Sequence, residues 1–135
     1  MIKEISVLTK NRYELINITK EVEKVVAESK IKEGSCFIFL PHSTAAIILT
    51  EDEAGLKEDW LKILRKLVEK EEFQHNLIDN NADSHILAGI LGQGKAIPIE
   101  NDHLVRGTWQ QIFLVELDGP RTRKVLITII SNFKK

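Results

Sequence analysis

The amino-acid sequence predicts a single α+β domain. Segments with the alternating or dense apolar pattern of strands occupy both ends of the chain, and two segments show the three- and four-residue apolar spacing of helices. The main elements follow the order ββαββαβββ, with about seven strands and two main helices, which is typical of an α+β protein. The 135 residues, 43% hydrophobic and 29% charged, suit one globular domain over 1–135.

The first third of the chain predicts two strands and a helix. Apolar alternation over 5–9 indicates a strand, and a tight turn at 10–12 would join it to a second strand from Tyr13. Thr19 stands where an N-cap would. The helix would end near Gly34, and its apolar stripe comprises Val22, Val25 and Val26.

Two strands and the longest helix follow. The apolar run 36–40 predicts a strand that Pro41 ends or bends, and 45–50 predicts another. The long helix would start near Asp52 or Glu53 and run to about Glu72. Its apolar face comprises Leu56, Trp60, Leu64, Leu67 and Val68.

The remainder predicts a polar loop, a short helix and three strands. The loop covers 74–84, and either Asp83 or Ser84 would cap a helix that Gly92 terminates. Asp-Gly within 118–121 lies between two apolar runs and predicts a hairpin. The three strands are expected at 96–99, 111–117 and 124–130.

Charge, apolar runs and cysteine content limit the classes of partner and the location that the sequence suggests. Nineteen basic and twenty acidic residues are interspersed, so no basic stripe indicates nucleic acid. No apolar run approaches the roughly 20 residues of a membrane helix. The single cysteine, Cys36, is expected to be buried and inert and cannot form an internal disulfide, so a cytoplasmic location is the simplest expectation.

The tripeptide His42-Ser43-Thr44 lies between two apolar strands, where a scaffold presents side chains to a ligand. Histidine transfers protons near neutral pH, and adjacent hydroxyls with their backbone N–H groups can hold phosphate oxygens. The alternative is that the hydroxyls cap a turn and the histidine is an ordinary surface residue.

Two further histidines bracket the polar loop. His75 and His85, together with His42, could form a three-nitrogen site with one position open for water, a common catalytic zinc arrangement. His85 is expected near a helix N-terminus, where the positive potential favours the neutral imidazole that metal binding or general-base chemistry needs. The alternative is a solvated loop without a ligand.

Each of the remaining candidate site residues has both a functional and a purely structural explanation. Trp109 and Gln110 precede a strand, so one of them could face a groove, although a packed tryptophan beside a solvent-facing glutamine explains the pair as well. Arg121 and Arg123 could clamp a phosphate or carboxylate, or be exposed turn residues. Glu51 could orient a histidine or simply begin a helix.

Several motifs together resemble the YjbQ-like family, in family order and at similar spacing from about Gly34 onward. One departure is Ser43-Thr44, where the family often has two threonines or Thr-Ser. The motifs are Pro41-His42-Ser43-Thr44-Ala45-Ala46 with Glu51, Asn81-Ala82-Asp83-Ser84-His85 with Gly92, Gly107-Thr108-Trp109-Gln110 with Glu116, and Asp118-Gly119-Pro120-Arg121.

The resemblance implies an α+β domain with two packed sheets, a homotrimer and a low thiamine-phosphate synthase activity, in which a pyrimidine diphosphate joins a thiazole phosphate and pyrophosphate leaves. By position it implies one site. Catalytic roles are expected for His42, Glu51 and His85, substrate binding for Ser43, Thr44, Asn81, Trp109, Gln110 and Arg121, and metal binding for His42, His75 and His85.

Three hypotheses are compatible with these residues. The first is an enzyme acting on a small phosphorylated molecule, with a divalent metal such as zinc or magnesium, although the sequence has no aspartate-rich magnesium motif. The second is a trimeric metal- or anion-binding module without turnover. The third is an interaction protein with an exposed apolar interface and no pocket.

Overall fold

The structure is a computed structural model and describes residues 2–133. It confirms a single α+β domain, with eight strands instead of the expected seven. The strands are β1 (Ile2–Leu8), β2 (Glu14–Asn17), β3 (Gly34–Phe39), β4 (Ala45–Thr50), β5 (Gly94–Glu100), β6 (His103–Leu104), β7 (Gln111–Glu116) and β8 (Thr122–Ser131). The helices are α1 (Thr19–Ser29), α2 (Ala54–Val68), α3 (Ala82–Leu91) and the 3₁₀ helix η1 (Gln74–Leu77).

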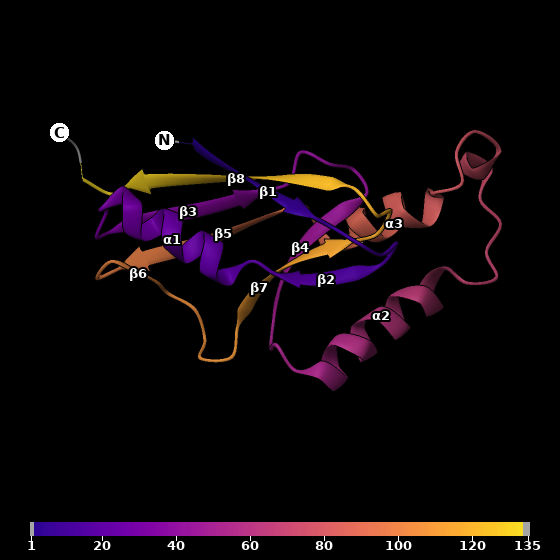
Figure 1. The fold of residues 1–135 in the computed structure, drawn as a ribbon, viewed down its shortest axis with the longest axis horizontal. Coiled ribbons are helices and arrows are strands. Elements are labelled where there is room, and N and C mark those ends of the chain that lie inside the picture. Colours follow the sequence, from indigo (N-terminus) through magenta and orange to yellow (C-terminus); the bar gives the residue numbers. More distant parts are fainter. Residues whose placement is uncertain (1, 134–135) are drawn as a thin grey trace.

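The strands form two antiparallel sheets that pack in layers. The larger sheet has the order β1-β8-β3-β5-β6 and the smaller β2-β7-β4. Residues of β4 and β7 alternate between two cores: Ile47 and Leu114 pack with α1 and the larger sheet, whereas Ala46 and Phe113 pack with α2 and α3. Figure 1 shows α1 over the five-stranded sheet and α2 beyond the three-stranded one.

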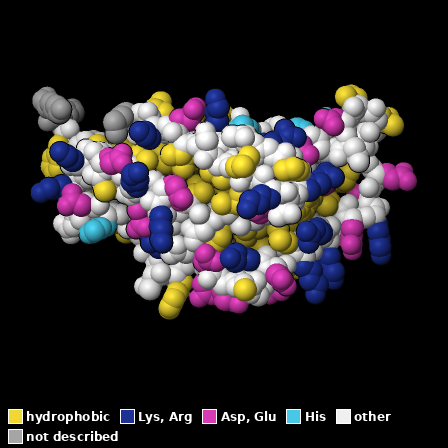
Figure 2. Space-filling model, in the orientation of Figure 1, with side chains coloured by type: hydrophobic (Ala, Val, Ile, Leu, Met, Phe, Trp, Pro, Cys, Tyr) yellow, Lys and Arg dark blue, Asp and Glu magenta, His cyan; other side chains and the backbone are white. Residues whose placement is uncertain are grey.

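Among residues 2–133, no helix or strand covers one face of the five-stranded sheet. In β3, Cys36 and Ile38 point into the core, and burial raises the pKa of the Cys36 thiol to about 11. The alternate residues Phe37 and Phe39 remain 43% and 40% exposed, and Ile130 on β8 is 57% exposed. On the side seen in Figure 2, charges of both signs are scattered, with hydrophobic side chains visible between them.

Three of the connections between the two sheets contain no helix or strand and lie close together near α3 (Figure 1). They are residues 9–13 between β1 and β2, 40–44 between β3 and β4, and 117–121 between β7 and β8. The predicted hairpin at 118–121 is therefore wrong, whereas the turn at 10–12 does join two strands, β1 and β2, as expected. The turn residues are where the sequence indicates, but the strands on either side pair with other partners. We call these three connections the crossover corner.

The helix ends also differ from the sequence-based prediction. Thr19 is the first residue of α1, with Ile18 in the cap position, and the Thr19 hydroxyl accepts the Ile112 N–H at 2.8 Å. The helix ends at Ser29, before a left-handed Lys30. Glu53 does cap α2, accepting from Gly55 N–H and Leu56 N–H at 2.6 and 2.8 Å.

Two more helix boundaries were misplaced. The helix α2 ends at Val68, four residues before the expected Glu72. The helix α3 begins at Ala82, with Asn81 in the cap position, so neither Asp83 nor Ser84 is its cap. Both side chains bond to other segments instead.

Candidate polar site at the crossover corner

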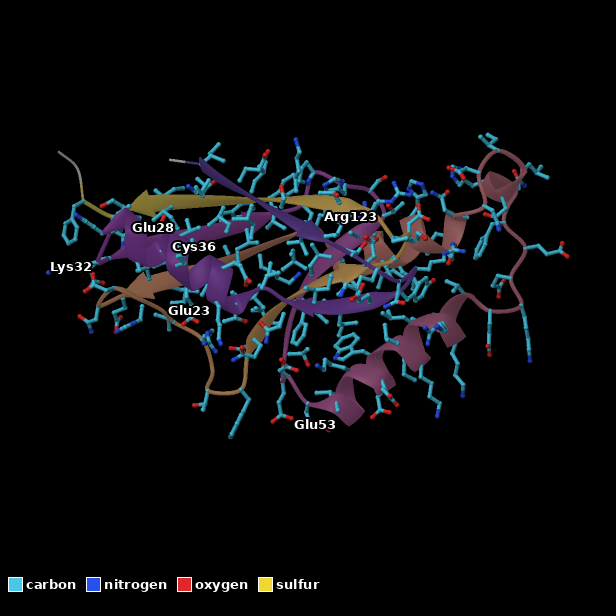
Figure 3. The ribbon with its side chains drawn as sticks, viewed as in Figure 1. Glu23, Glu28, Lys32, Cys36, Glu53 and Arg123 are labelled. Atoms are coloured by element: carbon cyan, nitrogen blue, oxygen red, sulfur yellow. The ribbon has the colours of Figure 1, made fainter. Side chains whose placement is uncertain are left out.

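A buried ion pair lies at the centre of the crossover corner. Glu116, the last residue of β7, is 0% exposed, and Arg123 on β8 is 1% exposed. The Arg123 guanidinium donates from Nε to Glu116 Oε1 at 2.9 Å and from Nη2 to Oε2. Arg123 lies near the end of β8 that approaches α3 (Figure 3). The alternative of an exposed turn residue is thus wrong for Arg123.

Three further groups donate hydrogen bonds to the Glu116 carboxylate. Thr9 Oγ1 donates to Oε1 at 2.8 Å, and the backbone N–H groups of Leu117 and Asp118 donate to Oε2, each at 3.0 Å. Burial alone would raise the pKa of Glu116, but the hydrogen bonds from Arg123, Asp118 and Thr9 hold this pKa below its usual value. The carboxylate therefore stays charged inside the protein.

Arg123 extends the network to the loop that carries His42. Its Nη2 donates to the Thr44 carbonyl oxygen at 3.0 Å and to Thr44 Oγ1 at 2.9 Å. Thr44 is 6% exposed, so its hydroxyl faces the ion pair and not solvent. Ser43, one residue earlier, is exposed. Of the two predicted phosphate-binding hydroxyls, only that of Ser43 is accessible on this chain.

His42 is held by the backbone of β8. Its Nε2 accepts the Lys124 N–H at 2.9 Å, so the imidazole carries its proton on Nδ1. Desolvation and the nearby charge of Arg123 lower the pKa of His42, partly opposed by Glu116. A neutral ring with an Nδ1–H donor results.

The same loop presents unused backbone donors. Among residues 2–133, the backbone N–H groups of His42, Ser43 and Thr44 have no hydrogen-bond acceptor. Two cations border the loop: Arg121, which is half exposed, and Lys124, whose ammonium lies a loose 3.9 Å from a Glu4 oxygen. N–H donors without a partner beside cations can donate hydrogen bonds to an anion.

A second branch runs from the corner to the polar loop. Asp118 Oδ2 accepts from Arg121 Nη2 at 3.1 Å and from Asn81 Nδ2 at 2.9 Å. Asn81 Oδ1 in turn lies 2.9 Å from His75 Nε2, which makes His75 the donor, and no hydrogen bond is made by its Nδ1 among residues 2–133. The His75 and His85 rings meet edge to face, with centroids 4.9 Å apart. Asn81 is 7% exposed and acts as a link between Asp118 and His75.

The start of α3, which follows the polar loop, is held by two connections of the crossover corner. Asp83 accepts from Arg12 Nη2 at 2.8 Å and from the Tyr13 hydroxyl at 2.6 Å, and Ser84 Oγ donates to the Leu117 carbonyl. The first and third connections of the corner therefore both hold the start of α3. Sequence reasoning missed these contacts, since Arg12 and Tyr13 lie about 70 residues from their partners.

His75 and His85 line a small pocket. It measures about 380 Å³, and its walls are Phe73, Gln74, His75, Ala82, His85 and Ile86. Among residues 2–133 of one chain, no group of three or more His, Cys, Asp or Glu side chains is placed to hold a metal ion. The expected three-histidine centre is not assembled within one chain, where only His75 and His85 are in mutual contact.

Three predicted site residues lie elsewhere. Glu51 follows β4 and Trp109 and Gln110 precede β7, and in the antiparallel register Thr50 faces Gln111 whereas Ala45 faces Glu116. Six-residue strands place this second group about 17 Å from the crossover corner. Trp109 is 70% exposed, and Gln110 Oε1 accepts the Gly107 N–H at 2.7 Å.

These features define a small α+β protein with two antiparallel sheets and a polar site where the chain crosses between them. The chain belongs to the YjbQ-like family, because the family model described as "UPF0047 protein YjbQ-like" matches residues 3–132. A UPF0047 protein of Archaeoglobus fulgidus is 40% identical over 125 residues, which cover 92% of this chain and 97% of the relative. UPF0047 protein YugU of Bacillus subtilis is 35% identical over 134 residues, 96% of this chain and 99% of the relative.

Solved structures agree with this membership. A YbjQ-like protein of unknown function from Sulfolobus solfataricus superimposes with a TM-score of 0.95 at 46% identity, covering 98% of this chain and 97% of its own. A hypothetical protein from Aeropyrum pernix gives a TM-score of 0.95 at 33% identity, with coverage of 98% and 99%. No helix within residues 2–133 is both long and apolar enough to cross a membrane.

Proposed function

We propose that this protein is an enzyme that binds a small phosphorylated molecule at the crossover corner and has a low thiamine-phosphate synthase-like activity. The observation that carries the proposal is the set of unpaired N–H groups at His42, Ser43 and Thr44, bordered by Arg121 and Lys124. Backbone donors and cations already in place stabilise phosphate oxygens without reorganisation.

The side chains at the corner have separable roles in this proposal. The Nδ1–H of neutral His42 and the Ser43 hydroxyl donate to phosphate oxygens, while Arg121 balances their charge. In thiamine-phosphate synthesis the departing group is pyrophosphate, so these donors would stabilise the leaving group. His75 and His85 line the adjoining pocket, which would take the organic part of a substrate.

A divalent metal remains part of the proposal. His75 and His85 could supply two imidazole ligands, and phosphate oxygens of a bound substrate could supply others. We derive no step of the reaction through such an ion, because one chain does not gather a third side-chain ligand for it among residues 2–133.

A homotrimer is proposed as the working assembly. Glu51, Trp109 and Gln110 lie at the far end of β4 and β7, and a neighbouring copy would bring this group to the crossover corner. The uncovered apolar face at Phe37, Phe39 and Ile130 offers an apolar surface for such contacts.

The enzyme proposal is tested by incubating the purified protein with the pyrimidine diphosphate and the thiazole phosphate, with and without Mg²⁺ or Zn²⁺. We expect slow formation of thiamine phosphate that His42→Ala abolishes. Absence of product under every condition, together with stoichiometric anion binding, would contradict turnover and favour the alternative of a binding module.

A further inference from the structure

Glu116 and Arg123 have a position that the proposed anion site does not explain by itself. Neither reaches solvent, so neither can touch a substrate directly. Their hydrogen bonds nevertheless end on all three connections of the crossover corner: Thr9 in the first, Thr44 in the second, and Leu117 and Asp118 in the third.

We propose that Glu116 and Arg123 are positioning residues, whose buried ion pair fixes the His42–Thr44 loop relative to the turn that carries Arg121. Arg123 holds the loop by the Thr44 carbonyl and hydroxyl. Glu116 holds the turn by the Asp118 N–H, and Thr9 Oγ1, which donates to Glu116, also accepts the Arg121 N–H at 2.9 Å. The His42–Thr44 loop and Arg121 are therefore both positioned relative to the Glu116–Arg123 pair.

The pair also links the two branches of the site. On one side, Lys124 follows Arg123 directly, and its N–H fixes the His42 ring. On the other side, the turn held by Glu116 places Asp118 against Asn81, which in turn orients His75. A shift of the pair would thus misplace both His42 and His75.

Burial of ionic groups need not serve stability. An apolar pair of similar volume is often as stable as a buried ion pair or more so, whereas removal of one partner alone is strongly destabilising. The planar Arg123 guanidinium donates to Glu116 and Thr44 at once. A lysine ammonium at the same place keeps the positive charge but does not fix the relative directions of these hydrogen bonds. Replacing the whole pair by apolar residues, or Arg123 by lysine, therefore distinguishes a positioning role of the pair from a purely structural one.

The test compares wild type with Glu116→Leu/Arg123→Met and with Arg123→Lys. The role rests on the proposed anion site, so pyrophosphate affinity by calorimetry is one readout, and amide hydrogen exchange of Lys124 is a second that needs no ligand. We expect the double variant to fold with a lowered melting temperature, because the Leu117 and Asp118 N–H groups lose their acceptor. It should also bind pyrophosphate at least tenfold more weakly and exchange the Lys124 amide at least tenfold faster. The Ile127 amide in the core of β8 is the internal control.

Each outcome decides the proposal. Unchanged Lys124 protection and unchanged pyrophosphate affinity in the folded double variant would overturn the positioning role. If the double variant does not fold, Arg123→Lys decides, because it retains the charge; wild-type behaviour of Arg123→Lys in both readouts would also overturn it. If wild type itself does not bind pyrophosphate, the proposed anion site fails, and the Lys124 amide alone then decides whether the pair positions His42.

Discussion

At the scale of single residues, His42 is the side chain whose chemistry is most constrained by its neighbours. The Lys124 N–H occupies Nε2, so protonation of the ring would break this hydrogen bond. The lowered pKa of His42 follows from desolvation and from the charge of Arg123. Neutral His42 is therefore the working form near pH 7.

This predicts a defined pH dependence. Because the folded-state pKa of His42 lies below its unfolded value of about 6.5, the unfolded chain binds the proton first as the pH falls. The stability contributed by neutral His42 is fully present above about pH 6.5 and is lost as the pH falls from there through the folded-state pKa. An NMR titration of the ring should show a midpoint below about 6.5. A midpoint at or above that value would contradict the assignment.

The sequence identified some residues of the crossover corner as site candidates, but it did not show which residues they contact. His42 and Ser43 were recognisable because polar residues interrupt two apolar strands. Glu116 had a detectable signal, a single carboxylate at the end of the apolar run 112–115, but its partner is set by the crossing of two strands from different sheets. Thr44 was expected to face a ligand, and only the structure shows it turned toward Arg123.

At the scale of elements, the turn between β7 and β8 is where local signals were most misleading. Asp118-Gly119 does form a turn, yet β7 pairs with β2 and β4 while β8 pairs with β1 and β3. Strand pairing over more than 70 positions is not encoded in the turn itself. The two-residue strand β6 was missed for a different reason: it is too short to show an apolar pattern and pairs with β5 across the turn at 101–102.

The packing around this turn predicts a position-dependent effect of adding one methyl group. A Cβ on Gly119 would overlap the Asn11 carbonyl oxygen and lie 2.8 Å from Glu116 Cγ and 2.9 Å from Thr9 Oγ1. Gly119→Ala should therefore lower the free energy of unfolding by about 1–3 kcal/mol and weaken anion binding.

The matched control is Gly89→Ala in α3, where an added Cβ meets nothing within 4 Å. This variant should gain about 0.5–1 kcal/mol from helix propensity. Chemical denaturation measures both free energies. Equal effects of the two substitutions would show that the crossover corner is not tightly packed.

At the scale of the whole molecule, the predicted site residues fall into two groups at opposite ends of the smaller sheet. The corner carries His42, Ser43 and Arg121, and the far end carries Glu51 and Trp109. The α+β class and the family were predictable from composition, order and motifs, whereas this separation depends on strand register. Within one chain, the strand register keeps the two groups apart.

The crossover corner is proposed to bind the phosphate part of a substrate. The most direct measurement is a calorimetric titration of wild type, Ser43→Ala/Arg121→Ala and Lys62→Ala with pyrophosphate at low ionic strength. Lys62 is an exposed residue of α2 and controls for the loss of one positive charge. We expect saturable binding at one site per chain in wild type and Lys62→Ala, and at least tenfold weaker binding in the corner variant. Equal affinity in all three proteins, or no binding by wild type, would contradict the account.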